Sequence, residues 1–190
     1  SKATIGTYIR HLRVFLRYLE GQKYIEPISD KIKPPKQPKK LVRIYTDDEI
    51  RQIFENIDIS PDWLRYRNCA VIALMLDSGL RLNEVCEIGL ADYDTRQGFI
   101  LIHGKGDKER LVPVGQFARH YLKRYMFAVP FNLSDEGGKR LFVNRYGSPL
   151  TRNAVKLLVQ DLKNRLPFEI SCHKLRHNFA TNYCIDEYAK

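Results

Sequence analysis

Apolar residues recur at intervals of three and four along the first 21 positions of the chain. This spacing places them on one face of a helix and predicts an amphipathic helix over residues 3–21. The predicted apolar stripe consists of Ile5, Tyr8, Ile9, Leu12, Phe15, Leu16 and Leu19. The basic residues Arg10, Arg13 and Arg17 share another face. Because one helix cannot bury such a stripe by itself, we expect it to pack against other helices or against the rest of the chain.

A different pattern follows over residues 30–43, where three prolines and six basic residues leave almost no apolar positions. Such a segment predicts an extended, self-repelling linker, and we place a domain boundary over residues 30–45. Each basic side chain in it could neutralise a phosphate, although most lysine-rich linkers are simply solvated. These side chains are Lys31, Lys33, Lys36, Lys39, Lys40 and Arg43.

Beyond the linker, the pattern predicts a larger, mainly helical domain over residues 46–190. Its first helix begins at a capping box formed by Thr46 and Glu49, and the next has Pro61 at its first helical position. Further helices are expected at Leu82–Ile88, Gln116–Phe127, Arg152–Leu166 and His173–Glu187.

Residues with high β-propensity interrupt this helical pattern in the middle of the domain. Phe99–Ile102 and Arg110–Val114 flank Gly104–Asp107, whose glycines permit a tight turn, so a β-hairpin is predicted. Leu141–Val143 is expected to form another short strand. The predicted fold class is therefore mainly α with a small antiparallel β-sheet (α+β).

Charge and composition narrow the possible partners. The 190-residue chain carries a formal net charge of +10, and 44% of its residues are hydrophobic, enough for at least one real core. Strongly basic domains most often bind polyanions such as nucleic acid, with a merely solubilising surface as the alternative. The longest apolar run, Cys69–Leu76, is too short to span a bilayer, and no signal peptide opens the chain. We therefore expect a cytoplasmic protein with no membrane partner.

The four cysteines are scattered along the chain and show no CxxC pairing. This arrangement favours reduced thiols over a disulfide framework. The one group that suggests a metal combines Cys172, His173, His177 and Cys184, and its spacing matches no common zinc site. No metal or other cofactor is therefore expected.

Three separate segments carry side chains suited to phosphate chemistry. Arg81 opens a helix after a glycine turn, and Glu84 follows at helical spacing, where it can hold the guanidinium. Lys105 lies between two glycines at the hairpin turn, from which a long side chain can reach a groove or deliver a proton. His173 and Arg176 share one face of the last helix, where they combine proton handling with charge stabilisation.

Each of these signals has an ordinary alternative when it is taken alone. Arg81 and Glu84 could be an exposed ion pair, and Lys105 could belong to a plain basic loop with Lys108 and Arg110. The histidine and arginine of the last helix could lie on an ordinary polar face. In combination, however, GLRLNEV, GKGDKERLVPV and HKLRHNFAT, in this order and with these separations, closely resemble the tyrosine recombinase (phage integrase) family. The resemblance covers nearly the whole chain.

The resemblance implies a domain organisation and a set of site residues. Residues 1–29 would be the C-terminal helix of a SAM-like core-binding domain, and residues 46–190 a recombinase catalytic domain lacking its C-terminal part. The implied catalytic residues are Arg81, Lys105, His173 and Arg176, with Glu84 and His177 in support. The residues expected to contact DNA are Arg10, Arg13, Arg17, Lys36, Lys39, Lys40, Lys108 and Arg110.

The chemistry implied by the resemblance is site-specific DNA recombination or integration through a 3′-phosphotyrosyl intermediate, without a metal. The implied partner is double-stranded DNA, bound by a homotetramer on two duplexes in a bacterial or archaeal cell. Tyr183 and Tyr188 fall in or next to the helix of Arg176, too early for the family's nucleophile. We therefore expect a fragment truncated at both ends that does not cleave DNA by itself. The alternatives are a non-catalytic DNA-binding module with the recombinase fold and an enzyme like the type IB topoisomerases.

Overall fold

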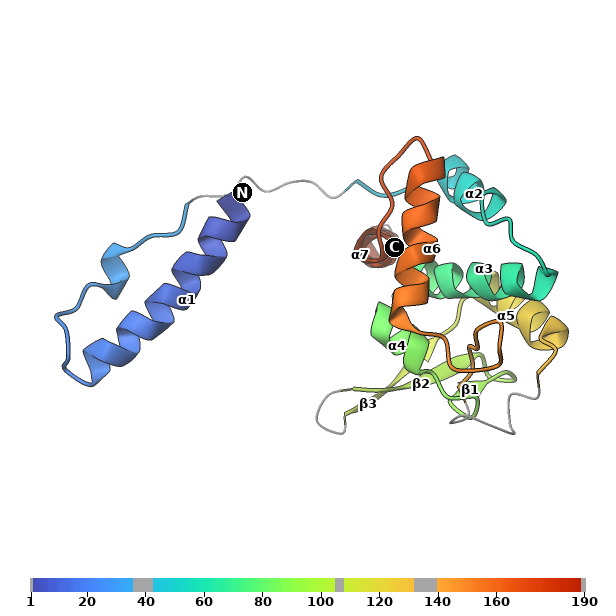
Figure 1. The fold of residues 1–190 in the computed structure, drawn as a ribbon, viewed down its shortest axis with the longest axis horizontal. Helices are drawn as coiled ribbons and strands as arrows, with labels where there is room; N and C mark the ends of the chain where they lie inside the picture. Colours follow the sequence, from blue (N-terminus) through green and yellow to red (C-terminus); the bar gives the residue numbers. More distant parts are fainter. Residues whose placement is uncertain (1, 36–42, 105–107, 132–139, 189–190) are drawn as a thin grey trace. The chain divides into compact units, whose positions relative to one another are not determined.

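The structure is a computed structural model that describes residues 2–35, 43–104, 108–131 and 140–188. It divides the chain into two compact units, Ser1–Val42 and Arg43–Lys190 (Figure 1). Across the described ranges, no helix combines the length and the apolar character that a membrane crossing requires. Four residues with a predicted role lie outside the described residues, namely Lys36, Lys39, Lys40 and Lys105.

The first unit consists of one long helix and the segment that follows it. Helix α1 (Lys2–Gly21) confirms the predicted helix, and the short 3-10 helix η1 (Ser29–Lys31) contacts it. Much of the predicted apolar stripe is exposed in the structure, including Ile5, Tyr8, Leu12 and Phe15. The first unit therefore does not bury its own apolar face.

Polar contacts hold this segment against the helix. Glu20, near the end of α1, accepts hydrogen bonds from the backbone amide of Ser29 at 2.6 Å and from its hydroxyl at 2.8 Å. Arg13 and Arg17 both donate to the carboxylate of Asp30, at 2.7 and 3.0 Å. Hydrogen bonds from Arg17 and Arg13 hold the pKa of Asp30 below its usual value. Two of the arginines expected to contact DNA are thus engaged within their own unit.

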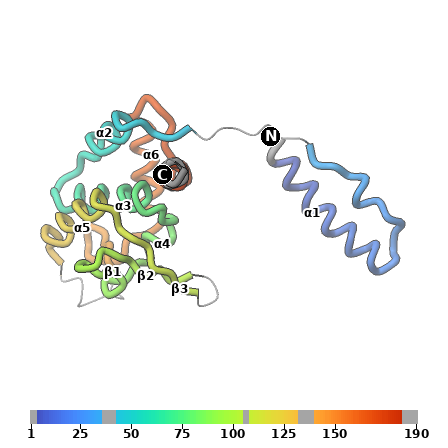
Figure 2. Tube along the Cα trace, turned by 180° about the vertical axis from the view of Figure 1, so that it is seen from behind, coloured from blue at the N-terminus to red at the C-terminus, as the bar shows by residue number. Residues whose placement is uncertain are grey.

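Helix α3 (Asp62–Asp77) lies at the centre of the second unit. Its residues 67–76 are all buried. A helix that is apolar around most of its circumference must be covered on every side. Helices α5 (Gln116–Ala128), α6 (Arg152–Arg165) and α7 (Cys172–Tyr188) all contact it and supply this cover (Figures 1 and 2).

A three-stranded antiparallel sheet lies beside this helical core. Its strands β1 (Tyr93–Asp94), β2 (Phe99–His103) and β3 (Glu109–Pro113) are paired in the order β1-β2-β3. The predicted hairpin of β2 and β3 is confirmed, with strand ends that differ by one residue. Strand β1 is missing from the sequence-based expectation because two residues carry no periodic signal.

The prediction of a strand at Leu141–Val143 is wrong. Val143 forms an isolated bridge with Pro149, and no strand of a sheet runs through this segment. The reason lies in the buried Tyr125, whose hydroxyl donates to the carbonyl of Leu141 and accepts from the amide of Val143, both at 3.1 Å. One side chain thus takes the backbone hydrogen bonds that a neighbouring strand would supply.

The sequence predicted how two helices begin, one with a capping box and one with a proline at its first position. The backbone amide of Glu49 donates to the Thr46 hydroxyl at 3.2 Å, and the Glu49 carboxylate accepts from the Thr46 amide at 3.0 Å. The predicted capping box of α2 (Asp47–Glu55) is therefore confirmed. Pro61, by contrast, is the N-cap of α3 and not its first helical residue. Its backbone is extended, with ψ of 165°, and the helix therefore begins at Asp62.

Candidate active site

A glycine turn brings the start of helix α4 (Leu82–Glu87) against helix α7. Gly79 has a φ of +61°, a conformation that glycine adopts readily and other residues rarely do. A Cβ at this position would also lie 2.3 Å from Cδ1 of Phe179 on α7. The turn therefore depends on glycine for two reasons, and it sets Arg81, the N-cap of α4, beside α7.

Arg81 is held by Glu84 through both its backbone and its side chain. The Arg81 amide donates to Oε2 of Glu84 at 2.8 Å, and its Nη1 donates to Oε1 at 2.8 Å. The Glu84 side chain is 12% exposed, whereas that of Arg81 is 59% exposed. The carboxylate thus anchors a guanidinium whose outer edge faces solvent.

A second arginine reaches the same carboxylate from the sheet. Nη2 of Arg110, on β3, lies 2.8 Å from Oε2 of Glu84. Burial raises the pKa of Glu84, but the hydrogen bonds from Arg110 and Arg81 outweigh it and lower the pKa to about 2. Glu84 is therefore a carboxylate at neutral pH, with arginines on two sides.

Helix α7 presents two different faces to its surroundings. Leu175 and Asn178 are buried, and Oδ1 of Asn178 accepts a hydrogen bond from the Tyr45 amide at 2.7 Å. This contact fixes the helix against the start of the second unit. His173 and Arg176 lie on the other side of the helix, in accordance with their three-residue spacing.

An open groove of about 480 Å³ lies between the start of α4 and this face of α7. It is lined by Arg81, Leu82, Cys172, His173, Arg176, His177 and Ala180. Nε2 of His173 lies 2.7 Å from Nε2 of His177, with the rings edge to face at 4.1 Å between centroids. One proton between these two nitrogens makes the contact a hydrogen bond, so His177 orients the ring of His173.

The groove carries an excess of positive charge. Burial lowers the pKa of Arg176, the charges of Arg81 and Arg110 lower it further, and Glu84 opposes them. Each of these three arginine side chains brings a positive charge to the groove or its margin. Three cations facing one carboxylate favour the binding of an anion of the size and charge of a phosphate.

Three of the four predicted catalytic residues therefore meet in one groove, although Lys105 lies outside the described residues. Beside it, the Gly104 amide donates to the Lys108 carbonyl at 2.6 Å, and Lys108 is exposed. In the first unit, Nε of Arg10 donates to a carbonyl of its own helix at 3.3 Å. No group of three or more histidine, cysteine, aspartate or glutamate side chains able to hold a metal ion occurs in the described parts of the chain.

Sequence reasoning missed the contact between Arg110 and Glu84, although a signal for it exists. Side chains alternate along a strand, so Arg110 shares its face with Val112 and with Val114 just beyond the strand end. Both valines are buried, whereas the intervening Leu111 is 67% exposed. An arginine in phase with buried positions at a sheet margin predicts a partner within the protein.

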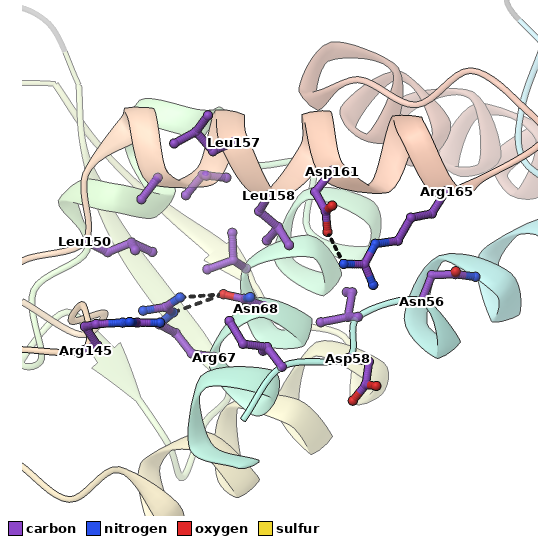
Figure 3. Close-up of a pocket in the computed structure, with 15 residues that line it drawn as sticks. Asn56, Asp58, Arg67, Asn68, Arg145, Leu150, Leu157, Leu158, Asp161 and Arg165 are labelled. Carbon is purple, nitrogen blue, oxygen red and sulfur yellow. Dashed lines mark hydrogen bonds and ion pairs between the residues drawn. The ribbon is translucent and has the colours of Figure 1, made fainter. Parts of the chain in front are cut away.

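A larger hollow of about 600 Å³ lies elsewhere, along α3 and α6 (Figure 3). Three of the charged side chains that line it have partners within the fold. Nη2 of Arg67 donates to Asn68 at 2.7 Å and Nη1 to the Val143 carbonyl at 3.0 Å, while Arg165 pairs with Asp161 at 3.0 Å. None of the predicted site residues lines this hollow.

Comparison with known proteins relates this geometry to a family. Residues 43–187 match the phage integrase family. The chain is 35% identical over 188 residues to the tyrosine recombinase XerC of Bacillus subtilis (strain 168). It is 34% identical over 188 residues to the tyrosine recombinase XerD of Oceanobacillus iheyensis. Each match takes in 96% of this chain and 62% of the relative, so the chain spans less than two thirds of their length.

Solved structures of recombinases and integrases have a fold similar to that of this chain. The Tn1549 transposon integrase in complex with circular intermediate DNA matches with a TM-score of 0.72 at 18% identity, over 98% of this chain and 67% of that one. The XerH site-specific recombinase bound to a palindromic difH substrate, in a post-cleavage complex, matches with a TM-score of 0.63 at 28% identity, over 78% and 44%. The family match over residues 43–187, together with these relatives, shows that the chain belongs to the phage integrase family of tyrosine recombinases.

Proposed function

We propose that the chain contains the phosphate-binding groove of an enzyme for site-specific DNA recombination or integration. The observation that carries this proposal is the groove in which Arg81, the N-cap of α4, meets His173 and Arg176 of α7. These residues come from distant parts of the sequence and combine two guanidiniums with an imidazole. The names of the relatives, tyrosine recombinases, and the net charge of +10 support a DNA phosphodiester as the substrate.

In the proposed reaction, a tyrosine hydroxyl attacks phosphorus and forms a 3′-phosphotyrosyl bond. The bond from phosphorus to the 5′ oxygen breaks, and that oxygen leaves as a hydroxyl. Arg81 and Arg176 would bind the non-bridging oxygens and stabilise the charge of the pentavalent transition state, as a metal does in other phosphoryl-transfer enzymes. His173, oriented by His177, would bind a phosphate oxygen or move a proton, and Lys105 would protonate the leaving oxygen.

The covalent intermediate lets the reaction run in both directions. Attack of a 5′-hydroxyl from a partner strand on the phosphotyrosyl bond rejoins DNA and releases the tyrosine. One phosphodiester is replaced by one phosphotyrosyl ester at each step, so no external energy source is required.

We place the nucleophile outside these 190 residues. Tyr183 and Tyr188 belong to α7, the helix of Arg176. With a rise of about 1.5 Å per residue, their backbones lie roughly 10 and 18 Å further along the helix axis than Arg176. Neither position suits in-line attack on a phosphate held beside the first turns of α7. This chain by itself is therefore proposed to bind DNA without cleaving it.

The test is adduct formation on a suicide substrate, a nicked duplex whose cleavage releases a short strand and traps the covalent intermediate. The full-length protein is expected to form a 3′-phosphotyrosyl adduct. Arg176→Ala should slow adduct formation by about 10²–10³-fold, the usual effect of losing one transition-state donor. The control is Arg51→Ala, which removes an exposed arginine that forms an ion pair with the surface residue Asp48. Absence of an adduct, or an undiminished rate in Arg176→Ala, would refute the enzymatic function.

A second function is favoured by the position of the two tyrosines. A non-catalytic DNA-binding module with the recombinase fold needs the basic groove and no nucleophile. It predicts that the full-length protein binds duplex DNA with a strong salt dependence and forms no adduct. The suicide substrate therefore separates the two functions directly.

The assembly is proposed by the same reasoning. We expect four copies to act on two duplexes in a bacterial or archaeal cell. Cross-linking of the full-length protein on paired DNA sites should give tetramers, and dimers alone would contradict this part of the proposal.

A further inference from the structure

We propose that Arg110 is a positioning residue, which holds Glu84 and through it Arg81, and that it does not contact DNA. The inference rests on the proposed function of the groove and deepens it. It replaces the expectation that Arg110 is one of the DNA contacts. The contact that carries it is the ion pair of 2.8 Å between Nη2 of Arg110 and Oε2 of Glu84.

Arg110 lies on the face of β3 that also carries core residues, and its side chain is 42% exposed. Arg110 pairs with Ile102 across the hairpin and is in phase with Val112. Ile102 and Val112 are both buried, and Leu111, on the other face, is exposed. A side chain on this face at the margin of the core reaches neighbouring elements more readily than a duplex beyond them.

The carboxylate of Glu84 has its two oxygens divided between two arginines. Oε1 binds Nη1 of Arg81, while Oε2 binds the Arg81 amide and Nη2 of Arg110. With its side chain only 12% exposed, Glu84 has little water to replace a lost partner. Removal of Arg110 would leave Oε2 with the single backbone amide and would free the carboxylate to turn about its terminal bond.

Rotation of the Glu84 carboxylate would affect the phosphate site because it would release the guanidinium of Arg81. The hydrogen bond from Nη1 of Arg81 to Oε1 of Glu84 restrains the Arg81 guanidinium, whose side chain is 59% exposed. A guanidinium that loses this restraint samples more rotamers and spends less time in a geometry suited to two phosphate oxygens. The same ion pair also ties strand β3 to helix α4. Arg110 therefore acts on the groove indirectly, because it contacts Glu84 and Glu84 in turn contacts Arg81.

The first test compares Arg110→Met with Arg96→Met in the full-length protein. Arg96 is an exposed arginine in the turn between β1 and β2 and serves as the matched control. On saturating suicide substrate, Arg110→Met should slow adduct formation by roughly 10- to 100-fold, while Arg96→Met leaves the rate unchanged. The slope of log binding constant against log salt concentration should stay the same in Arg110→Met. Loss of a direct phosphate contact would instead reduce that slope by about 0.9.

The second test is a double-mutant cycle with Glu84→Gln. If Arg110 acts through Glu84, Arg110→Met should have less than about a twofold effect on the rate once Glu84 is replaced. If Arg110 acts on DNA directly, the two effects should multiply. Arg110→Lys should recover part of the rate, because lysine can still pair with the carboxylate. The acid limb of the pH–rate profile should also move to higher pH in Arg110→Met, since Glu84 loses a hydrogen bond that keeps it ionised.

The proposal would be overturned if Arg110→Met reduced the salt slope of DNA binding and left the rate of adduct formation unchanged. It would also be overturned if the effects of Arg110→Met and Glu84→Gln on the rate multiplied, or if the acid limb of the pH–rate profile stayed in place in Arg110→Met. The absence of an adduct in the wild-type protein would refute the proposed function and not the role of Arg110. In that case the decisive measurement is the NMR signal of the Arg81 Nε–Hε group in this chain. Arg110→Met should move it in the same direction as Glu84→Gln, and a signal that stays in place would overturn the positioning role.

Discussion

Replacement of Glu84 by glutamine should destabilise the second unit by an amount that depends on pH. Glutamine has nearly the same shape, but its amide nitrogen would face a guanidinium, and it carries no charge. The pKa of Glu84 lies at about 2, against an ordinary 4.5, because hydrogen bonds from Arg110 and Arg81 outweigh burial. At about 1.4 kcal/mol per pKa unit, this difference is worth at most roughly 3 kcal/mol of unfolding free energy at neutral pH. Partial screening of the exposed arginines reduces the expected loss to about 2 kcal/mol.

The sign of the pH dependence follows from the lowered pKa. A carboxylate with a folded-state pKa below its unfolded value stabilises the fold fully above about pH 4.5. Below that value the unfolded state takes up protons first, and the contribution of Glu84 fades until the pH reaches about 2. The gap in stability between wild type and Glu84→Gln should therefore be constant from pH 7 to about 5 and should narrow toward pH 3.

The assay is urea unfolding at constant ionic strength, followed by fluorescence of Trp63, the single tryptophan. Trp63 is buried at the start of α3 and reports on the second unit. Glu87→Gln, on an exposed side chain of the same helix, is the control and should change stability by less than about 0.5 kcal/mol. A gap below about 0.5 kcal/mol at pH 7, or one that does not narrow in acid, would show that the ion pairs of Glu84 do not stabilise the fold.

Two further predictions concern the glycine turn and the hairpin. Gly79→Ala should cost about 3 kcal/mol or more in urea unfolding, because a left-handed conformation and a clash with Phe179 add up. Gly98→Ala, also at positive φ but facing a movable arginine side chain, should cost only about 1–2 kcal/mol, and equal losses would exclude the clash as a cause. The pKa of His103 is raised, mainly by its hydrogen bond with Asp92 at 3.2 Å, so its ion pair should persist below that pKa and be lost as pH rises through it. An NMR titration of His103 should show a midpoint that falls in Asp92→Asn, and an unmoved midpoint would contradict the pairing.

The features that the sequence determined by itself are those whose partners lie within a few residues. The capping box of Thr46 and Glu49 joins positions three apart, and the hairpin of β2 and β3 closes over a short glycine-containing turn. The central position of α3 follows from the uninterrupted apolar run Cys69–Leu76, because this part of the helix has no side that can face water. The approach of Arg81 to Glu84 is local in the same sense.

Other features were decided by tertiary structure alone. Tyr125 forms hydrogen bonds with the backbone of Leu141 and Val143 that a neighbouring strand would otherwise form. No local sequence pattern predicts this contact. Arg110 carries the same charge as a DNA-contacting residue, and only the packing of β3 beside α4 shows that a carboxylate binds it.

The groove depends both on local sequence motifs and on tertiary packing. The residue types that bind phosphate, Arg81, His173 and Arg176, are visible in the sequence as motifs. Their meeting depends on Gly79, whose missing side chain lets the turn before α4 lie against Phe179 of α7. Local hydrogen bonds and hydrophobic periodicity can be read along a chain, whereas a contact between distant segments depends on how the whole core packs.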